Sequence, residues 1–469
     1  MPNAGGESWS DGKRWLWLLS PALPVIGLGS VLAVMVGAPA AILWALPVIF
    51  YGLVPFLDWW IGEDSVNAPE SAVAALNSDR YYLRIVYAYI PSQYLATIFG
   101  AWLAVNGHLG VGGILGLIVT VGIVNGVAIN TAHELGHKTQ ALERWLAKIT
   151  LAPVAYGHFF VEHNRGHHVR VATPEDPASS KMGETFWQFL PRTVIGSAQS
   201  AWHIEGERLA RQKKPVWSVH NENLQAWAMT VVFFGALTMW LGPWALAFLV
   251  VQAAFGASLL EVVNYLEHYG LVRQKQADGR YERCQPRHSW NSNHVVTNLF
   301  LYQLQRHSDH HANPTRRYQA LRHFDGSPQL PSGYAAMILI AYIPSLWFRI
   351  MDPKVVKHHG GDLTKANLYP PRREELLARW SRTAPAVKNP EGVDAADVAD
   401  APRAEAAAPK LRIDAGTRYQ CPNCEYVYDP RIGSPHHGYP AGTPWASIAH
   451  DWCCPDCAVR EKPDFKPLA

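Results

Sequence analysis

The chain has 469 residues, of which 49% are hydrophobic and only 17% are charged, and its formal net charge is +3. An average soluble domain carries about 25% charged residues, so this composition argues against a disordered or fibrous protein. Because the net charge is small and no stripe of Lys and Arg is present, nucleic acid is not an expected partner.

Six apolar stretches are each long enough to cross roughly 30 Å of hydrocarbon as a helix. They predict a mostly α-helical, six-span transmembrane bundle in a lipid bilayer, with spans at Trp15–Val36, Ala40–Ile61, Tyr82–Val105, Val111–Ala132, Leu224–Leu241 and Trp244–Glu267. The three shortest connections between spans carry no Lys or Arg, whereas the segments at the other ends of the spans carry many. By the positive-inside rule, we expect the basic side and both ends of the chain in the cytoplasm.

A seventh apolar stretch, Gly333–Met351, is interrupted by Pro344 and carries Arg349 near its end. A full crossing there would place the C-terminal region on the outer side. We therefore expect a re-entrant or interfacial helix in this stretch.

Nine of the 21 histidines form tight groups at the predicted cytoplasmic ends of the spans. On a helix, residues three or four positions apart share a face, so each group can direct its imidazoles at one point. Crowded imidazoles without a ligand would repel one another when protonated, whereas imidazole binds Zn, Cu, Fe and Ni well. Nine ligands exceed the needs of one ion, so we expect two ions held by His133, His137, His163, His167, His168, His268, His307, His310 and His311.

Two other kinds of metal site fit only part of this pattern. Residues 133–137 form an HExxH motif, which in zinc proteases supplies two ligands and a general base. Such a protease needs one further ligand, whereas seven more histidines are present here. A ferritin-like di-iron site needs two Glu-x-x-His pairs, and only Glu134 with His137 forms one.

Histidines that bind a metal usually donate their second ring N–H to a carboxylate, a carbonyl or water. Polar residues near the histidines in sequence are candidates for this role, and ordinary solvated charge is the alternative for each. The expected set is Glu134, Glu261, Asn264 and Asp309, with Glu162, Asp176 and Glu267 as further candidates.

The histidine-rich strings resemble the histidine boxes of the integral-membrane di-iron oxygenases and desaturases, and within that group the membrane alkane 1-monooxygenases. The resemblance covers roughly residues 10–380 and is carried by Asn130–Lys138, Glu162–His168, Asn264–Leu271 and Leu304–Pro314. It implies two non-haem irons on the nine histidines, O₂ activation, and hydroxylation of the terminal methyl of medium- and long-chain n-alkanes to 1-alkanols. It also implies a bacterial inner (plasma) membrane location.

A second metal site is predicted near the C-terminus, where four thiolates suit tetrahedral Zn or Fe. Its candidate ligands are two C-x₂-C pairs, Cys421 with Cys424 and Cys454 with Cys457. The gap between the pairs exceeds the 15–20 residues usual in zinc ribbons. The surrounding residues, from Tyr419 to Phe465, resemble rubredoxin, which implies a small β-rich domain with one iron on the four cysteines. The chain departs from the usual rubredoxin pattern at Ser447, Cys453 and Ala458.

A stretch rich in Ala, Pro, Asp and Glu separates these two parts and predicts a linker. The expected organisation is a membrane di-iron hydroxylase domain at 10–380, a flexible linker at 381–415 and a rubredoxin domain at 416–469. A tethered carrier keeps its effective concentration high. We therefore expect the fused rubredoxin to pass electrons from an NAD(P)H-dependent rubredoxin reductase to the di-iron site.

Other functions remain open at this point. A related desaturase, or a hydroxylase of another lipid-like substrate, would use the same di-iron centre and would differ in its product. A metal transporter would place ligands at mid-membrane, whereas these lie at span ends. Phe56, Trp59 and Trp60 could line a route for the alkane, although a belt of aromatic residues at the membrane interface is the favoured alternative.

Overall fold

The computed structural model describes residues 9–277, 279–381, 417–422, 426–435, 438–450, 452–456 and 459–468. The predicted linker beyond Ser381 lies outside the described residues, as do Cys424 and Cys457.

Among the described residues, five helical segments are long and apolar enough to cross a membrane, at Leu16–Met35, Ala40–Ile61, Val111–Gly136, Glu222–Leu241 and Pro243–His268. The first contains α1 (Leu19–Met35), the second contains α2 (Ala45–Val48) and α3 (Val54–Ile61), and the others are α6, α11 and α12. The helices α15 (Tyr334–Ala341) and α16 (Pro344–His358) form a sixth candidate that is bent by 119°. The prediction of a mostly helical membrane fold is thus confirmed.

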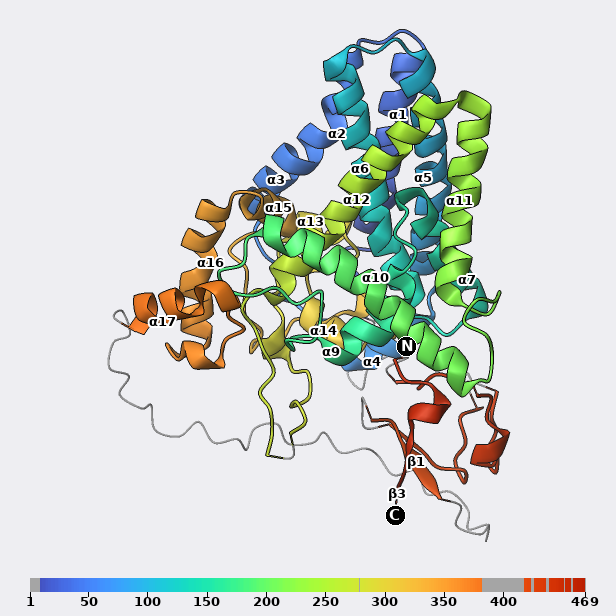
Figure 1. Ribbon diagram of the computed structural model, residues 1–469, viewed down its shortest axis with the longest axis vertical. Helices are drawn as coiled ribbons and strands as arrows, with labels where there is room; N and C mark the ends of the chain where they lie inside the picture. Colours follow the sequence, from blue (N-terminus) through green and yellow to red (C-terminus); the bar gives the residue numbers. More distant parts are fainter. Residues whose placement is uncertain are drawn as a thin grey trace.

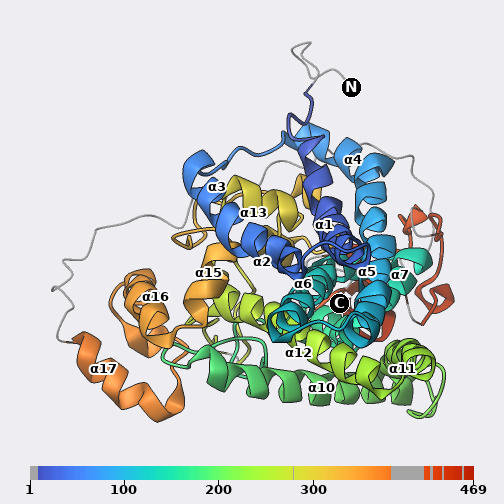
Figure 2. The ribbon, with the colours of Figure 1, turned by 90° about the horizontal axis from the view of Figure 1, so that it is seen from above.

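The predicted third span is a single helix, α5 (Arg80–Asn106). It is not one of the five apolar segments named above. It stands beside α1 and α6 in the bundle (Figures 1 and 2). Its polar residues face inward: the Gln93 amide donates hydrogen bonds to Asn125 Oδ1 of α6 and to the Thr150 carbonyl, each at 3.0 Å. Polar side chains that hydrogen-bond inside the bundle lower the mean hydropathy of a helix without exposing those side chains to lipid.

The bend between α15 and α16 falls at Pro344, the residue that interrupts the apolar stretch. Proline lacks the N–H that would continue the helical hydrogen bonding, so a break begins there. That this hairpin is re-entrant or interfacial stays a prediction.

Two glycines bring α6 and α12 into direct backbone contact. A Cβ on Gly126 of α6 would lie 2.8 Å from the Gly256 carbonyl oxygen of α12, and a Cβ on Gly256 would lie 3.0 Å from the Gly122 carbonyl oxygen. Small residues permit this close approach of membrane helices. The contact fixes the relative position of the two helix ends that carry His133 and His268.

Shorter elements lie around the lower part of the long helices in Figure 1. They are α4 (Glu70–Ser78), α7 (Ala141–Leu151), α8 (Phe159–Val161), α9 (His168–Arg170), α13 (Val295–Phe300), α14 (His307–Ala312) and α17 (Arg373–Ser381). The long helix α10 (Phe186–Arg211) runs obliquely along one side of this part and packs against α12.

The C-terminal unit contains a small antiparallel sheet of β1 (Arg418–Gln420), β2 (Val427–Tyr428) and β3 (Lys466–Leu468), in the order β2-β1-β3. Its core packs aromatic and aliphatic side chains around the two described cysteines of the C-x₂-C pairs. The buried members are Cys421, Tyr428, Ile448, Trp452, Cys454, Val459 and Phe465. This confirms the predicted small β-rich domain.

Candidate metal centre

Four segments from distant parts of the chain carry the nine predicted histidines. The ends of α6 and α12 supply three of them, α14 supplies three, and the stretch between α8 and α10 supplies the rest. In that stretch a π-helical turn, Glu162–His167, lies between α8 and α9. Because the turns of a π-helix are wider than those of an α-helix, they place side chains at spacings that an α-helix does not.

The structure brings all nine histidines together in two adjoining groups. The potential ligand atoms of each group lie within 4.8 Å of one another, and every member is buried. The first group contains His133, His137, His163, His168 and His310; the second contains His167, His268, His307 and His311.

These spatial groups differ from the sequence groups. The four-residue offset predicted that His163 and His167 point to one place, but they belong to different groups. Instead, His163 and His168, five residues apart, bring their Nε2 atoms to 3.1 Å. The π-helical turn explains the difference, since its hydrogen bonds join residues five apart. That the nine residues bind iron stays a prediction.

The donor set fits metal ions. The His133 and His310 Nε2 atoms lie 2.9 Å apart, as do the Nε2 atoms of His307 and His311. Ring nitrogens that converge in this way can share one proton, or they can share a metal ion, for which imidazole is a good ligand.

Two of these histidine rings also have one ring nitrogen within hydrogen-bond distance of an oxygen atom that belongs to neither histidine group. His167 Nδ1 lies 2.9 Å from Asp176 Oδ2, and His268 Nδ1 lies 3.1 Å from the His288 carbonyl oxygen. An N–H donated from each Nδ1 leaves a lone pair on each Nε2, the tautomer that a metal requires. Both Nε2 atoms are buried and have no hydrogen-bond partner among the described residues.

Comparison with known proteins supports this interpretation of the site. A family model named fatty acid desaturase matches residues 109–341, and one named rubredoxin matches residues 418–465. The alkane 1-monooxygenase of Acinetobacter baylyi is 51% identical over 383 residues, which cover 81% of this chain and 94% of that protein. The chain belongs to the alkane 1-monooxygenase family.

Other relatives agree with this assignment. Alkane 1-monooxygenase 1 of Alcanivorax borkumensis is 49% identical over 378 residues, covering 79% of this chain and 92% of that protein. The hydroxylase component XylM of the Pseudomonas putida xylene/toluene monooxygenase is more distant, at 29% identity over 52% of this chain and 64% of its own length.

The four polar residues expected around the metals of this monooxygenase are buried, but their contacts are mainly with groups other than the nine histidines. Glu134 pairs with Lys138 at 3.1 Å, and Asp309 pairs with Arg316 at 2.8 Å. Glu261 accepts hydrogen bonds from Tyr156, Thr193 and Asn264 at 2.6, 2.8 and 3.1 Å. Their role in orienting rings stays a prediction.

Two of the further candidates contact histidines directly. Besides Asp176, which accepts from His167, Glu267 has its Oε2 3.2 Å from His307 Nε2 and its Oε1 bonded by the Tyr334 hydroxyl at 3.0 Å. The sequence signal that could separate them from the others is weak, because neither lies at a helical offset from the histidine that it contacts.

An apolar cavity adjoins the histidines inside the bundle. Its polar wall comprises His133, His163, His307, Asn130, Asn264 and Glu267. Its apolar wall comprises Phe50, Gly126, Val127, Phe159, Leu259, Leu260, Val263, Leu301, Leu304 and Ile338. Sequence reasoning missed these apolar residues, because nothing distinguishes them from other residues of the spans.

The aromatic residues suggested for that route lie elsewhere. The exposed fractions of Phe56, Trp59 and Trp60 are 53%, 76% and 71%, and none of the three lines the cavity. This favours the interface belt over the substrate route.

The rubredoxin unit carries two described cysteines in positions that suit iron. Cys421 and Cys454 are 2% and 0% exposed in a shared core. The Cys421 N–H donates to the Tyr426 carbonyl at 2.9 Å, and the Cys454 N–H donates to the Arg460 carbonyl at 2.7 Å. Two buried thiols in one core fit half of a four-thiolate site, which is the part that the described residues cover.

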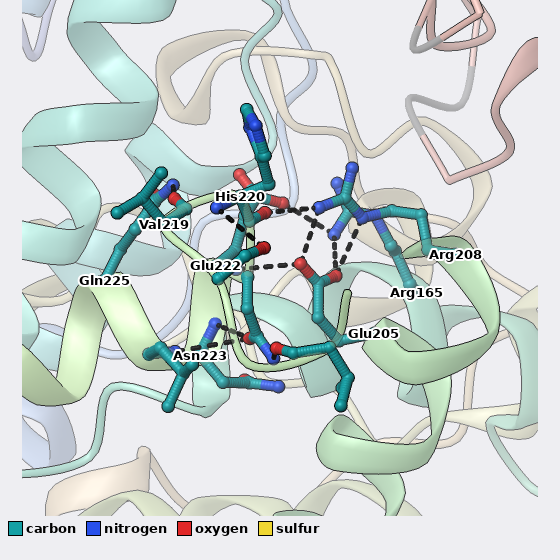
Figure 3. A network of polar contacts seen from close by, with 12 residues as sticks. Arg165, Glu205, Arg208, Val219, His220, Glu222, Asn223 and Gln225 are labelled. Carbon is teal, nitrogen blue, oxygen red and sulfur yellow. Dashed lines mark hydrogen bonds and ion pairs between the residues drawn. The ribbon is translucent and has the colours of Figure 1, made fainter. Parts of the chain in front are cut away.

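The rubredoxin unit contacts the membrane domain through Arg165, which lies between the predicted ligands His163 and His167 in the sequence. The Arg165 guanidinium lies 3.2 Å from Glu461 of the rubredoxin unit, 2.7 Å from Glu222 and 3.5 Å from Glu205. Figure 3 shows the membrane-domain side of this network, in which Arg208 also binds Glu205, at 2.5 Å. Burial opposes the charge of Arg165, but the three carboxylates raise its pKa well above the usual range.

The metal-free protein should lose stability as the pH falls below about 6.5. Burial, with repulsion from neighbouring rings, lowers the pKa of His310 and of His311 well below its usual range. In the unfolded chain these rings take up protons near pH 6.5, whereas in the fold they stay neutral, so acid favours unfolding.

Thermal unfolding of chelator-treated protein between pH 8 and pH 5 checks this expectation. The iron-loaded protein is the control, and its midpoint should change less over the same range, because bound metal resists protonation of its ligands. A metal-free midpoint that is the same at pH 8 and pH 5 would contradict the expectation.

Proposed function

We propose that this chain is a membrane-bound alkane 1-monooxygenase that uses O₂ to hydroxylate the terminal methyl of medium- and long-chain n-alkanes. The observation that carries the proposal is the apolar cavity whose wall includes members of both histidine groups. A hydrocarbon is the substrate class that such a cavity accepts, because most of its lining residues are apolar and its polar residues include the predicted metal ligands.

The nine histidines would hold two irons, and an iron pair supplies reductive activation of O₂ and insertion of one oxygen atom into a C–H bond. The chain's own residues bind, orient and exclude water around that pair. Buried Asp176 and the His288 carbonyl fix His167 and His268 in the tautomer that exposes Nε2. Glu267, held by Tyr334, has its carboxylate beside His307 Nε2, the nitrogen that faces His311, so it would lie next to the ion and not behind the ring.

The apolar wall positions the alkane end-on. Transfer of an alkane from lipid into a protein cavity gains little free energy, because the roughly 0.8 kcal/mol per methylene applies to transfer out of water. Selectivity for chain length therefore depends on the length and shape of the cavity.

The fused rubredoxin would deliver the electrons, one at a time, from an NAD(P)H-dependent rubredoxin reductase. In the docked position Val169, adjacent to His168, packs against the core that contains Cys421 and Cys454. This supports a direct route from the cysteine site to the first histidine group. Both parts then share one side of the membrane, which the positive-inside rule assigns to the cytoplasm of a bacterial inner membrane.

Purified full-length protein with iron tests the proposal. It is mixed with NADH, a rubredoxin reductase, O₂ and n-octane, and the products are separated by gas chromatography. Formation of 1-octanol supports the proposal, whereas an alkene would assign the chain to desaturation, the activity named by the family model that matches residues 109–341. Iron content well below three per chain, or stoichiometric zinc, would count against the cofactor assignment.

Filling the cavity should shorten the preferred alkane. We expect Ile338→Phe to lower the rate on hexadecane relative to octane by roughly tenfold, because a cavity rejects added methylenes sterically. Leu260→Ala, which enlarges the same cavity, should shift the ratio the other way.

The matched control is Leu339→Phe. Leu339 is the next residue on α15, is 39% exposed and does not line the cavity. Product ratios from mixed alkanes give the measurement. Equal shifts of these ratios in the Ile338→Phe and Leu339→Phe variants would mean that the cavity does not set the preferred chain length.

A further inference from the structure

The docked rubredoxin unit turns described residues next to Cys421 and Cys454 toward the membrane domain. Asp456 is two residues beyond Cys454, and its carbonyl accepts a hydrogen bond from Thr315 Oγ1 at 3.2 Å. Val169 packs against the same side of the unit. The part of the unit closest to its iron ligands is therefore the part that faces the predicted di-iron site.

A cavity of about 670 Å³ lies between the two parts at this place. Pro422, which follows Cys421, and Arg460 line it from the rubredoxin side, while His168 and His311 line it from the membrane domain. A space of this size admits water, ions or a small molecule. It does not admit a second protein, such as a flavoprotein reductase.

We propose that the docked unit can give an electron to the histidine groups but cannot take one from its reductase, so that it must leave this position to be reduced. The inference rests on the proposed function. In each cycle the reduced flavin of the reductase loses one electron, and the ferric rubredoxin site becomes ferrous. That electron then passes to the di-iron site, and the rubredoxin site returns to ferric. No bond forms or breaks in the rubredoxin site.

The physical reason is distance. Electron tunnelling slows steeply with separation, so a reductase must approach the cysteines closely. In the docked position the described residues next to Cys421 and Cys454 face the membrane domain, and a reductase bound to another face would have the body of the unit between its flavin and the iron. Docking and reduction therefore compete for one surface.

The contacts that hold the unit suit repeated release. Two ion pairs contribute, Arg165 with Glu461 at 3.2 Å and Arg211 with Asp464 at 3.9 Å. Ion pairs are weakened by salt and by exposure, and the Arg211 and Asp464 side chains are 40% and 22% exposed. The 35 residues from 382 to 416 could extend to at most about 120 Å, so the covalent connection permits a full departure.

A reversible cross-link provides the test. The variant Arg211→Cys with Asp464→Cys, in the full-length iron-loaded protein, is treated with a short bis-maleimide that contains a cleavable disulfide. The pair lies outside the predicted metal sites, and the link holds the unit in its docked position. The control is Arg211→Cys alone, treated in the same way, which also reports any reaction at Cys284 or Cys453.

Loss of the visible absorption of ferric rubredoxin gives the readout. With dithionite, the linked and control proteins should bleach at similar rates, which shows that the iron site is intact. With NADH and rubredoxin reductase, the linked protein should bleach at least tenfold more slowly than the control. Cleavage of the link with a phosphine should restore the control rate.

Bleaching of the linked protein by the reductase at the control rate would overturn the inference. The proposed function is tested separately, by reducing the linked protein with dithionite, removing the excess and adding O₂ and octane. Because dithionite reduces both predicted iron sites directly, 1-octanol should form with the link intact. If 1-octanol fails to form before and after cleavage, the proposed function fails, while the result on reductase access stands.

Discussion

Replacing His311 with alanine should abolish formation of 1-alkanol and remove about one iron per chain. His311 belongs to the group of four, and its loss leaves three imidazoles for that ion. Metal ions of this kind contribute several kcal/mol of transition-state stabilisation, so the rate should fall by roughly 100-fold or more. Iron per chain should fall from about three to about two, because the group of five and the rubredoxin site keep their ligands.

The control for this variant is His203→Ala. The His203 side chain is 76% exposed and pairs with Glu207 at the surface, outside both groups. Both proteins should show full rubredoxin absorption, which confirms that the rubredoxin unit keeps its iron. Full iron content and activity in the 311 variant would mean that the ring is not a ligand.

The sequence predicts which histidines matter but not how they are shared. Their number and helical spacing are enough to bring nine rings to one end of the bundle. The division into five and four depends on the π-helical turn at Glu162–His167, which sends His167 to one group and its neighbours His163 and His168 to the other. A π-helical turn has no strong local sequence signal, so α-helical periodicity gives the wrong partner for His163.

The polar residues around the histidines were less predictable for a related reason. Proximity in sequence suggested that Glu134 and Asp309 orient the histidine rings. In the structure they form ion pairs with Lys138 and Arg316. A buried carboxylate is stabilised most by a cation, and which cation reaches it is set by tertiary packing. Arg165 was overlooked as a docking residue in the same way, since its partner Glu461 is almost 300 residues away.

The spans illustrate the opposite case, in which apolar composition carries nearly all the information. Five of the six predicted spans coincide with apolar helices of the structure. The exception, α5, is a helix of 27 residues in which the Gln93 amide donates hydrogen bonds inside the bundle. Hydropathy reports contact with lipid, so it is least informative for a helix that has polar partners on its inner face.

Asp176→Asn should weaken iron binding by roughly 10- to 100-fold while preserving the size of the side chain. Asp176 accepts hydrogen bonds from His167 Nδ1 at 2.9 Å, from the Ser179 hydroxyl at 2.6 Å and from the Ala178 N–H at 3.1 Å. An asparagine amide has one oxygen, so its NH₂ must face one of these donors. If it faces His167, the ring proton moves to Nε2, and that nitrogen can no longer bind a metal.

Iron retention during a chelator titration measures this effect, with Asp362→Asn as the control. Asp362 has a side chain that is 44% exposed, accepts from the Thr364 N–H at 3.1 Å and lies outside both histidine groups. The 176 variant should lose one iron at a chelator concentration that leaves the control and the group of five unchanged, and 1-alkanol formation should fall in proportion to that iron. Loss of iron from the rubredoxin site instead, or equal retention of iron in both variants, would mean that Asp176 supports the fold without setting the tautomer of His167.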